Sequence, residues 1–493
     1  MLKRARVSYQ QRLRKGGQGY DEVRRVTALS CRERAARAAS AWGWGPKRTE
    51  KWWGPKRTEK WWGPTSAEKC GRLVAPRVVG VPTVVLALVA FAHVISLAAQ
   101  APARDSWPQW RGPARTGVLT VDEAPVMWPP ELKKGWSVEV GEGYSSPVSG
   151  GGRVFVHARW DPDEVVSAID LATGAVAWQQ KYPAPMEKNP YAKQMAKGPY
   201  STPLLADERL YTLGTTAIVS AWNASTGALV WRRDFSSRID TSKLFCGTAM
   251  SPLLTKSGVI VHVGDDRGGT IAALDPSTGK ERWTTDVRGP GYASPIEVTL
   301  GGVAQVVTMT TRSVIGVDTT SGTVLWEFPF DDEWNENIVT PIATPTGVIV
   351  SGVRQGTRRL IVAKSGTAWS ATQAWHTPDV AMYMSSPVLA NGTIFGHSSK
   401  RKGQFVAMDP ETGKLLWGTE GRNATSASVV AAGDHLVFLT TESQMIVTPA
   451  DPKGFHEVRR YTIAPSTTYA HPIVLRDRVI VRDASTVSLW ALR

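Results

Sequence analysis

The stretch "SPLLTKSGVIVHVGDDRGGTIAALDPSTGKERW", residues 251–283, is the clearest copy of the unit that decides the fold. It opens with a small polar residue and Pro, continues with two β-rich runs, and closes with the pattern D-x-x-[TS]-G-x-x-x-W. Copies recur eight times between residues 144 and 493, with 41 to 56 residues between opening positions. The opening prolines are Pro147, Pro203, Pro252, Pro295, Pro341, Pro387 and Pro472, and Ser428 takes this place in the seventh unit. Such a period indicates radial or solenoid architecture.

Each unit predicts four short antiparallel strands. The opening Pro suits the first residue of a strand, and runs such as residues 258–263 are β-branched and bounded by Gly and Asp. Asp275 can form an Asx-turn, and Gly279 supplies the positive φ of a tight turn. We expect the closing Trp to fill the wedge between neighbouring sheets. The closing residues are Trp178, Trp231, Trp283, Trp326 and Trp417, with Trp375 as a candidate in the degenerate fifth unit and none in the seventh.

The last unit holds only three strands' worth of sequence before Arg493. The missing strand has a donor upstream, because "LKKGWSVEV" at residues 132–140 matches "GALVWRRDF" at residues 227–235 in pattern. We therefore predict that the N-terminal strand joins the final sheet and that Trp136 closes the ring. Closure of this kind removes exposed sheet edges.

The charge of the chain lies almost entirely at its beginning. Residues 1–76 hold 19 Lys or Arg and 6 Asp or Glu, which accounts for +13 of the net charge of +15. The basic pI therefore gives no reason to expect a nucleic-acid partner. "WGPKRTEKW" occurs at residues 44–52 and again at 53–61, with no hydrophobic period to fold around. This block is either a disordered basic extension or an untranslated stretch before a start near Leu73 or Val74.

Residues 77–101 have the pattern of an export signal, with a positive flank, an apolar stretch and a small-x-small site at Ala99 and Ala101. The alternative is an uncleaved anchor in the inner membrane. Both interpretations place residues 102–493 outside the cytoplasm, and we expect a periplasmic protein. Only Cys246 follows the signal, so we expect no internal disulfide there and treat this residue as a small buried hydrophobe.

The pattern A-x-D-x-x-T-G-x-x-x-W, at residues 168–178, 273–283 and 407–417, resembles the tryptophan-docking motif of pyrroloquinoline-quinone (PQQ) repeat propellers. The segment "WPQWRGPARTGV", residues 107–118, resembles the leader of a group of exported PQQ-like proteins. The resemblance implies an all-β fold over residues 102–493: an eight-bladed β-propeller of four-stranded antiparallel blades.

Members of this superfamily differ in function. Quinoprotein dehydrogenases bind PQQ with Ca²⁺ and use an Asp base, and many carry an adjacent Cys-Cys pair, whereas the assembly protein BamB has no cofactor and binds partner proteins. This chain has no Cys-Cys pair and no residues that match the dehydrogenase catalytic set, and it also lacks the lipid-anchoring Cys of BamB. We expect a monomeric, non-catalytic scaffold that binds protein partners without a cofactor. The alternative is a PQQ-dependent oxidoreductase with Ca²⁺.

No phosphate loop, zinc-spaced His/Cys cluster or G-x-S-x-G turn follows the signal. The acidic stretch at residues 331–337 could hold Ca²⁺, but we interpret it as a solvated loop and predict no metal.

Tyrosine recurs three residues before the opening Pro, and in a propeller these positions surround one mouth of the channel. The residues are Tyr144, Tyr200, Tyr292 and Tyr469. The longest connector, residues 182–200, adds Lys188, Lys193 and Lys197. We hypothesise that this rim binds the partner; the alternative is that the tyrosines only pack the channel entrance.

Overall fold

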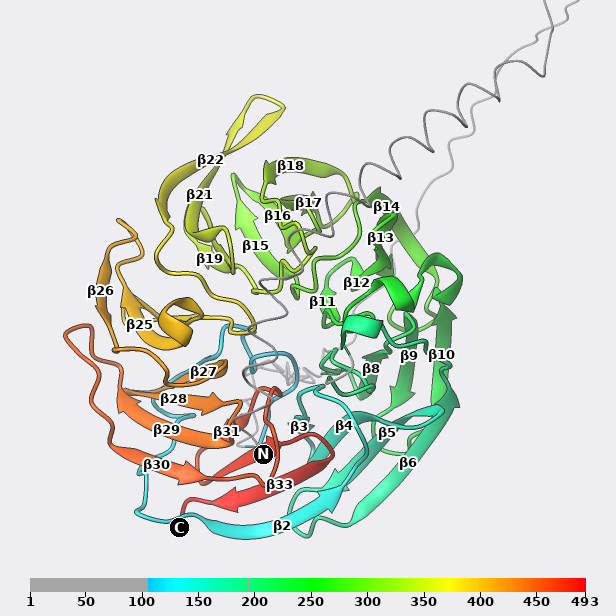
Figure 1. The fold of residues 1–493 in the computed structure, drawn as a ribbon. Helices are drawn as coiled ribbons and strands as arrows, with labels where there is room; N and C mark the ends of the chain where they lie inside the picture. Colours follow the sequence, from blue (N-terminus) through cyan, green and yellow to red (C-terminus); the bar gives the residue numbers. More distant parts are fainter. Residues whose placement is uncertain (1–104, 193–194) are drawn as a thin grey trace, which may run out of the picture. The chain divides into compact units, whose positions relative to one another are not determined.

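The computed structural model describes residues 105–192 and 195–493, so the expectations for residues 1–76 and 77–101, and for Lys193, lie outside the described residues. The described residues form eight sheets around one axis, with no α-helix among them (Figure 1). The prediction of an eight-bladed propeller is confirmed. We number the blades 1 to 8 in chain order.

Blades 1 to 4 each contain four antiparallel strands. The first strand of each blade lies nearest the channel and the fourth lies at the outer rim. Blade 1 comprises β3 (Val148–Gly150), β4 (Arg153–Trp160), β5 (Asp163–Asp170) and β6 (Val176–Pro183). Blade 2 comprises β7 (Leu204–Ala206), β8 (Arg209–Leu213), β9 (Ile218–Asn223) and β10 (Leu229–Asp234). Blade 3 comprises β11 (Leu253–Thr255), β12 (Gly258–Asp265), β13 (Gly268–Leu274) and β14 (Glu281–Val287). Blade 4 comprises β15 (Ile296–Leu300), β16 (Val303–Met309), β17 (Ser313–Asp318) and β18 (Val324–Pro329).

Blades 5 to 8 repeat this order with additions from the N-terminal segment. Blade 5 comprises β19 (Ile342–Thr344), β20 (Gly347–Gly352), β21 (Gly356–Ser365) and β22 (Ala368–Thr377). Blade 6 comprises β23 (Val388–Ala390), β24 (Thr393–Ser398), β25 (Gln404–Met408) and β26 (Leu415–Gly418). Blade 7 comprises β27 (Ala427–Ala432), β28 (His435–Thr440), β29 (Gln444–Pro449), β30 (Arg459–Thr462) and a fifth strand, β1 (Val118–Leu119). Blade 8 comprises β31 (Ile473–Leu475), β32 (Arg478–Arg482), β33 (Thr486–Ala491) and β2 (Lys133–Glu139).

Four single-turn 3-10 helices lie in the connections: η1 (Pro190–Ala192), η2 (Ser236–Arg238), η3 (Thr241–Lys243) and η4 (Lys400–Lys402).

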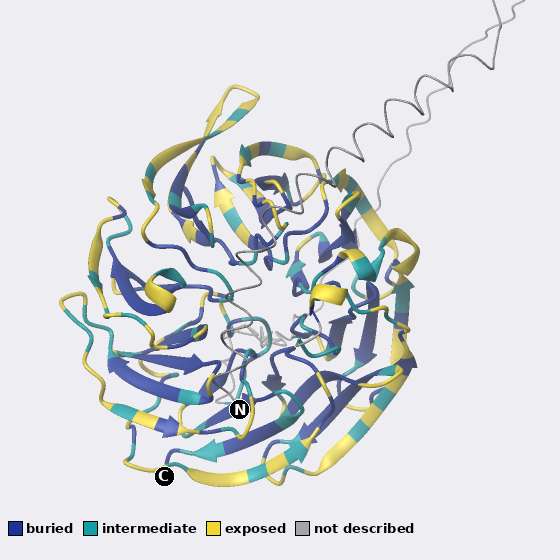
Figure 2. Ribbon diagram, viewed as in Figure 1, coloured by how far each residue is buried: buried dark blue, intermediate teal, exposed yellow. Residues whose placement is uncertain are grey.

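The middle strands of most blades are buried on both faces, and the outer half of β21 in blade 5 is an exception. In blade 3 every residue of β12 is buried, whereas the outer strand β14 has no buried residue and alternates between exposed and half-buried positions (Figure 2). A blade has a neighbour on each side, so its inner strands have no solvent face and read as continuous β-branched runs. The polar-apolar alternation survives only at the rim.

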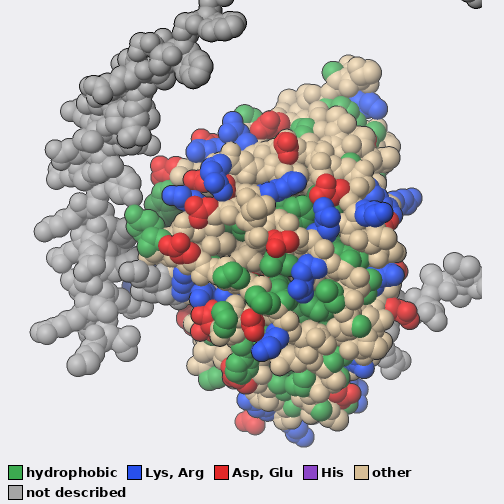
Figure 3. All heavy atoms as spheres, turned by 90° about the vertical axis from the view of Figure 1, so that its right-hand side faces the viewer, with side chains coloured by type: hydrophobic (Ala, Val, Ile, Leu, Met, Phe, Trp, Pro, Cys, Tyr) green, Lys and Arg blue, Asp and Glu red, His purple; other side chains and the backbone are tan. Residues whose placement is uncertain are grey.

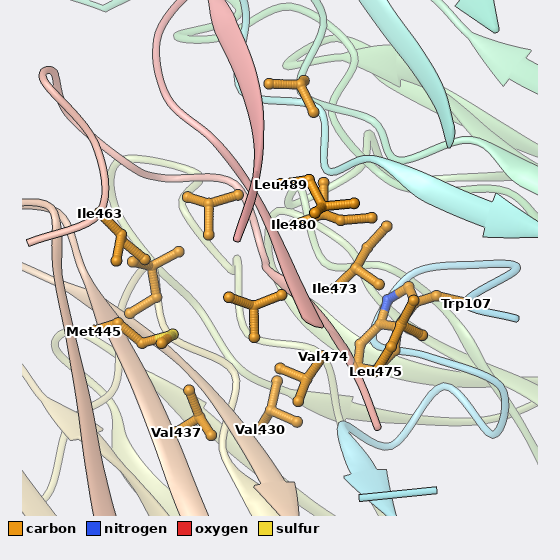
Figure 4. Close-up of a cluster of buried hydrophobic side chains, with 14 of the residues drawn as sticks. Trp107, Val430, Val437, Met445, Ile463, Ile473, Val474, Leu475, Ile480 and Leu489 are labelled. Carbon is orange, nitrogen blue, oxygen red and sulfur yellow. The ribbon is translucent and has the colours of Figure 1, made fainter. Parts of the chain in front are cut away.

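The hydrophobic core lies between blades rather than at a single centre. The largest cluster joins three blades, with Val430 from blade 7, Ile480 from blade 8 and Val154 from blade 1 (Figure 4). Blade 8 therefore packs against the first blade as well as against the seventh.

Strand β2 pairs antiparallel with β33, with Trp136 opposite Leu489 (Figure 1). Further contacts join blade 8 to blade 1. Arg482 Nη1 donates to the carbonyls of Ser145 and His157, at 2.8 and 2.7 Å. The short strand β1, which runs parallel to β27, was not predicted from the sequence.

In six of the eight blades a tryptophan on the outer strand connects the blade to the next one through the indole N–H. In these contacts Nε1 donates to a backbone carbonyl in the turn between the third and fourth strands of the following blade. The pairs are Trp136 to Leu171, Trp178 to Ala224, Trp231 to Pro276, Trp283 to Thr319, Trp375 to Pro410 and Trp417 to Asp451, at 2.9–3.0 Å.

The Gly of the repeat lies against the tryptophan of the preceding blade. Gly322 has a φ of 75°, and a Cβ built on it would lie 2.6 Å from the ring of Trp283. The position therefore needs Gly twice, for its left-handed backbone and for the space that the ring occupies. Asp275 Oδ1 accepts from the N–H groups of Ser277 and Thr278, which confirms the predicted Asx-turn.

Trp326 departs from the predicted docking role. Its Nε1 donates to Gln305 Oε1 of the same blade at 2.7 Å, and its side chain is buried. The reason lies in blade 5, where the long β21–β22 hairpin replaces the D-x-x-T-G turn that receives the other tryptophans. Without that turn, Trp326 packs onto Gly316 of its own blade.

A fully buried polar network joins blades 1 and 2. Glu164 accepts from the Tyr182 hydroxyl at 2.6 Å and from the Thr215 N–H at 2.8 Å, and lies 3.3 Å from His157 Nε2. Burial alone would raise the pKa of Glu164, but the interactions with His157, Thr215 and Tyr182 outweigh it and lower the pKa to about 2. The carboxylate is thus held ionised inside the protein.

We expect Glu164 to make the propeller sensitive to acid. Because its pKa is lowered on folding, its contribution to stability is present above the unfolded value of about 4.3 and is lost as the pH falls towards about 2. Urea unfolding between pH 7 and pH 2.5 should show a steeper loss of stability for the wild type than for Glu164→Gln. Parallel curves for the two proteins would contradict this assignment.

The outer surface carries interspersed charges. On the side seen in Figure 3, Lys and Arg alternate with Asp and Glu among small hydrophobic groups. In the part of the chain that the structure describes, no helix has both the length and the apolarity needed to cross a membrane.

Candidate functional site

The segment of residues 107–118, which we call the leader segment, lies in the central channel. Arg115 is buried there and bonds to the inner ends of two blades: its Nη1 donates to the Pro252 carbonyl at 2.9 Å and its Nε to the Pro295 carbonyl at 2.7 Å. Arg111, also buried, donates to the carbonyl of Pro387 in blade 6. The leader segment therefore plugs the channel and ties several blades together.

The leader backbone is bent to aim these side chains inward. Arg111 and Arg115 have φ values of 60° and 61°, in the left-handed region that side chains other than Gly rarely adopt. Burial lowers the pKa of each guanidinium to about 9, and for Arg115 the charge of Arg111 adds to the effect. Both remain cationic at neutral pH.

Serine hydroxyls just before the opening prolines form a collar on the other side of this plug. The serine collar consists of Ser146, Ser251, Ser294 and Ser386, and each hydroxyl accepts the backbone N–H of the matching residue in the preceding blade. The donors are His471, Thr202, Ser251 and Thr340, at 2.7–3.1 Å. The link from His471 to Ser146 spans blades 8 and 1.

The four predicted tyrosines lie together above the serine collar. All of them line one partly open cavity of about 130 Å³, which we call the tyrosine cavity. Tyr144 lies between two others, with ring centroids 5.7 Å from Tyr200 and 4.9 Å from Tyr469. The cavity wall also includes Ala249, Ile338 and Met384, which occupy the same repeat position in three other blades.

Hydrogen bonds fix two of the tyrosines. The Tyr200 hydroxyl donates to the Ala196 carbonyl at 3.0 Å, and the Tyr292 hydroxyl accepts the Phe245 N–H at 2.9 Å. Burial raises the pKa of both phenols, so they stay protonated. Cys246, which is half-buried, lines the same cavity, and burial raises the pKa of its thiol to about 12. Its thiol is therefore not activated as a nucleophile.

One carboxyl group reaches the tyrosine cavity. Glu336, from the acidic loop between blades 4 and 5, lines its wall and accepts the Tyr383 hydroxyl at 2.6 Å. Burial raises the pKa of Glu336, Tyr383 lowers it, and the negative charge of Asp332 raises it again. Among the described residues no cation forms an ion pair with this carboxylate.

The floor of the cavity is formed by Trp110 and His471, whose rings meet edge to face at 5.3 Å. Burial, and next the charge of Arg111, lower the pKa of His471 to about 3, so the ring is neutral. Neither of its ring nitrogens makes a hydrogen bond of ordinary geometry.

Of the predicted lysines, Lys188 and Lys197 belong to the described residues, and neither lines the cavity. Lys197 forms an ion pair with Asp161 at 2.6 Å, and Lys188 donates to the Met195 carbonyl. Met195 does line the cavity, so the connector approaches the mouth through its methionine. In the acidic loop, Asp331 forms an ion pair with Arg312 and Glu333 with Arg354, so two of the four carboxylates are paired. The described residues contain no group of three or more His, Cys, Asp or Glu able to hold a metal.

Sequence reasoning missed Glu336, Trp110 and His471 as parts of this site. Glu336 belongs to the acidic loop of residues 331–337, and the sequence of this loop does not indicate which of its carboxylates faces the channel. His471 could have been found, because it replaces the Ser or Thr that precedes the opening Pro in six of the other units.

The chain belongs to the PQQ-like propeller family described as "Outer membrane protein assembly factor BamB", whose model matches residues 129–198 and 162–419. This agrees with the repeat pattern, the eight blades and the docking tryptophans.

Curated relatives fall in two groups. The chain is 25% identical over 294 residues to the quinohemoprotein alcohol dehydrogenase ADH-IIG of Pseudomonas putida, covering 54% of this chain and 37% of that protein. It is 23% identical over 293 residues to the outer membrane protein assembly factor BamB of Yersinia pestis, covering 55% of this chain and 69% of the relative. The chain thus spans little more than a third of the dehydrogenase.

Solved structures show the same fold at low identity. A europium-containing methanol dehydrogenase matches with a TM-score of 0.56 at 13% identity, covering 79% of this chain and 98% of that one. BamB from Moraxella catarrhalis matches with a TM-score of 0.53 at 16% identity, covering 73% and 98%.

Proposed function

We propose that this protein is an extracytoplasmic, non-catalytic propeller that binds a protein partner at the channel mouth lined by Tyr144, Tyr200, Tyr292 and Tyr469. The observation that carries the proposal is the combination of a channel plugged by the protein's own leader segment and a mouth lined by tyrosines. The leader segment closes the channel beneath the tyrosine cavity, and tyrosine and methionine side chains are typical of surfaces that bind proteins.

Family membership supports the same role. Relatives named as outer membrane protein assembly factors contain this fold, which is consistent with a protein partner and a periplasmic location. A partner segment would lie across the connectors of residues 184–203 and 235–250, which contact each other where Asn189 Nδ2 donates to the Ser242 carbonyl at 3.0 Å.

Site-specific photo-crosslinking tests whether the partner binds at the channel mouth. A photoreactive amino acid in place of Tyr191, which is 78% exposed on the connector, should crosslink a discrete partner in cells. The matched control replaces Leu229, which is 48% exposed on the outer strand of blade 2, and should give no such product. A partner captured only from position 229 would place the binding surface on the outer strands of the propeller and overturn the proposal.

The quinoprotein alternative has the sequence relation to alcohol dehydrogenases in its favour. The residues that line the tyrosine cavity do not fit PQQ with Ca²⁺. PQQ is an anion with several carboxylates, yet the described residues that line the tyrosine cavity include a carboxyl group and no Lys or Arg. Ca²⁺ takes six to eight oxygen ligands including carboxylates, and Glu336 supplies the single carboxylate among the described residues that line the cavity. The volume is also below the roughly 300 Å³ at which pockets for larger ligands begin.

A further inference from the structure

A second cavity, of about 380 Å³, lies on the other side of the leader segment. Its base is formed by Arg111 and Arg115, and its walls come from the inner strands of blades 3 to 6. The wall residues include Leu253, Leu254, Ile296, Ile342 and Leu389, and Glu297 lies at its edge. We call this the arginine cavity.

The two guanidinium groups carry charge that the described residues do not neutralise. Arg111 and Arg115 are 3% and 5% exposed, yet neither has a carboxylate within ion-pair distance among the described residues. Burial lowers the pKa of each guanidinium. Buried charges are normally paired, because desolvation without a counter-charge is costly. The two like charges also repel each other, which an anion would relieve.

Arg111 has unused hydrogen-bonding capacity as well. Its Nη2 donates to the Pro387 carbonyl, but its Nε is buried without a partner, although the side chain lines the cavity. By contrast, the Nε, Nη1 and Nη2 groups of Arg115 all donate to backbone carbonyls. Arg111 is therefore the arginine of the cavity that has an unpaired donor, and Arg115 adds its charge.

We propose that the arginine cavity binds a small organic carboxylate whose apolar body lies against the leucine and isoleucine walls and whose head receives hydrogen bonds from Arg111. A planar carboxylate matches the guanidinium fork. The walls favour an apolar body over a bare inorganic ion, and the single carboxylate at the edge, Glu297, disfavours a ligand with several negative charges. The carboxylate could be a free acid or the C-terminus of a peptide.

Isothermal titration calorimetry on the full chain in low-salt buffer tests the site with hexanoate as the probe. Hexanoate should bind with one-site saturation, whereas hexan-1-ol and hexylammonium should not bind. Equal binding of hexan-1-ol would mean that the cavity is merely apolar, and tighter binding of inorganic phosphate would mean that the walls contribute nothing. Either result would overturn the proposal. Acetyl-Gly-Leu with a free or an amidated C-terminus distinguishes the sources: binding of the free-acid form alone would identify a peptide terminus as a competent ligand.

Three variants distinguish a loss of binding caused by removing the charge of Arg111 from a loss caused by misfolding. Arg111→Gln should weaken hexanoate binding about tenfold or more, as expected for losing a charged hydrogen-bond partner. The control Arg282→Gln, at a surface ion pair with Asp275, should bind as the wild type does. If Arg111→Gln fails to fold, Ala343→Trp fills the cavity from an exposed position on β19 and keeps both arginines. Unchanged hexanoate binding in that variant would refute the site.

Discussion

Replacing strand β2, residues 133–139, with a Gly/Ser linker of equal length should abolish cooperative folding of the propeller. The replacement removes six cross-strand pairs with β33 and the docking of Trp136 onto the carbonyl of Leu171. Cross-strand pairs contribute about 0.2–1 kcal/mol each and a large aromatic side chain about 3–5 kcal/mol. The total, about 4–11 kcal/mol, is comparable with the whole stability of a typical protein.

The expected readout is the loss of a single thermal transition, with aggregation through the exposed edge of β33. A Gly/Ser replacement of residues 363–368, the exposed tip of the β21–β22 hairpin, provides the control and should leave the transition nearly unchanged. If the β2 replacement unfolds with the wild-type midpoint, blade 8 does not need its fourth strand, and ring closure by this strand is wrong.

Trp283→Ala should destabilise the protein by about 3–5 kcal/mol, because the substitution removes a docking ring and its hydrogen bond to Thr319. Denaturant unfolding measures the change. The control is Trp334→Ala, at a side chain that is 61% exposed, where a change within about 0.5 kcal/mol is expected. A loss below about 1 kcal/mol for Trp283→Ala would show that the blade register is wrong.

A double-mutant cycle tests the contact itself. Gly322→Ala forces a Cβ to within 2.6 Å of the Trp283 ring, so it should be destabilising in the wild type. With Trp283 already replaced by Ala, that clash is gone and only the backbone cost of the left-handed φ of 75° remains. The two substitutions should therefore be clearly less than additive. Additive effects would show that the two residues do not touch.

Much of the fold could be predicted because each repeat carries its own signals. The Pro before the inner strand, the Asx-turn at Asp275 and the Gly against the tryptophan are local, so a single unit contains them all. Trp326 shows where this reasoning fails. The position of a docking tryptophan depends on the turn of the next blade, and blade 5 has lost that turn.

The site was less predictable than the fold. The tyrosines could be placed together, because they share one position in the repeat and the repeat fixes their direction toward the channel. Arg111 and Arg115 belong to the leader segment, which lies outside the repeat, so no period indicated that this segment enters the channel. Glu336 likewise comes from an irregular loop. Contacts between non-repeating segments and the channel depend on the closed ring as a whole.

The proposed non-catalytic role is tested most directly by incubation with PQQ and Ca²⁺ followed by a dye-linked assay on alcohols and sugars. We predict no dye reduction above that of a sample lacking the protein. Stoichiometric PQQ binding together with dye reduction would contradict the account and establish a quinoprotein dehydrogenase.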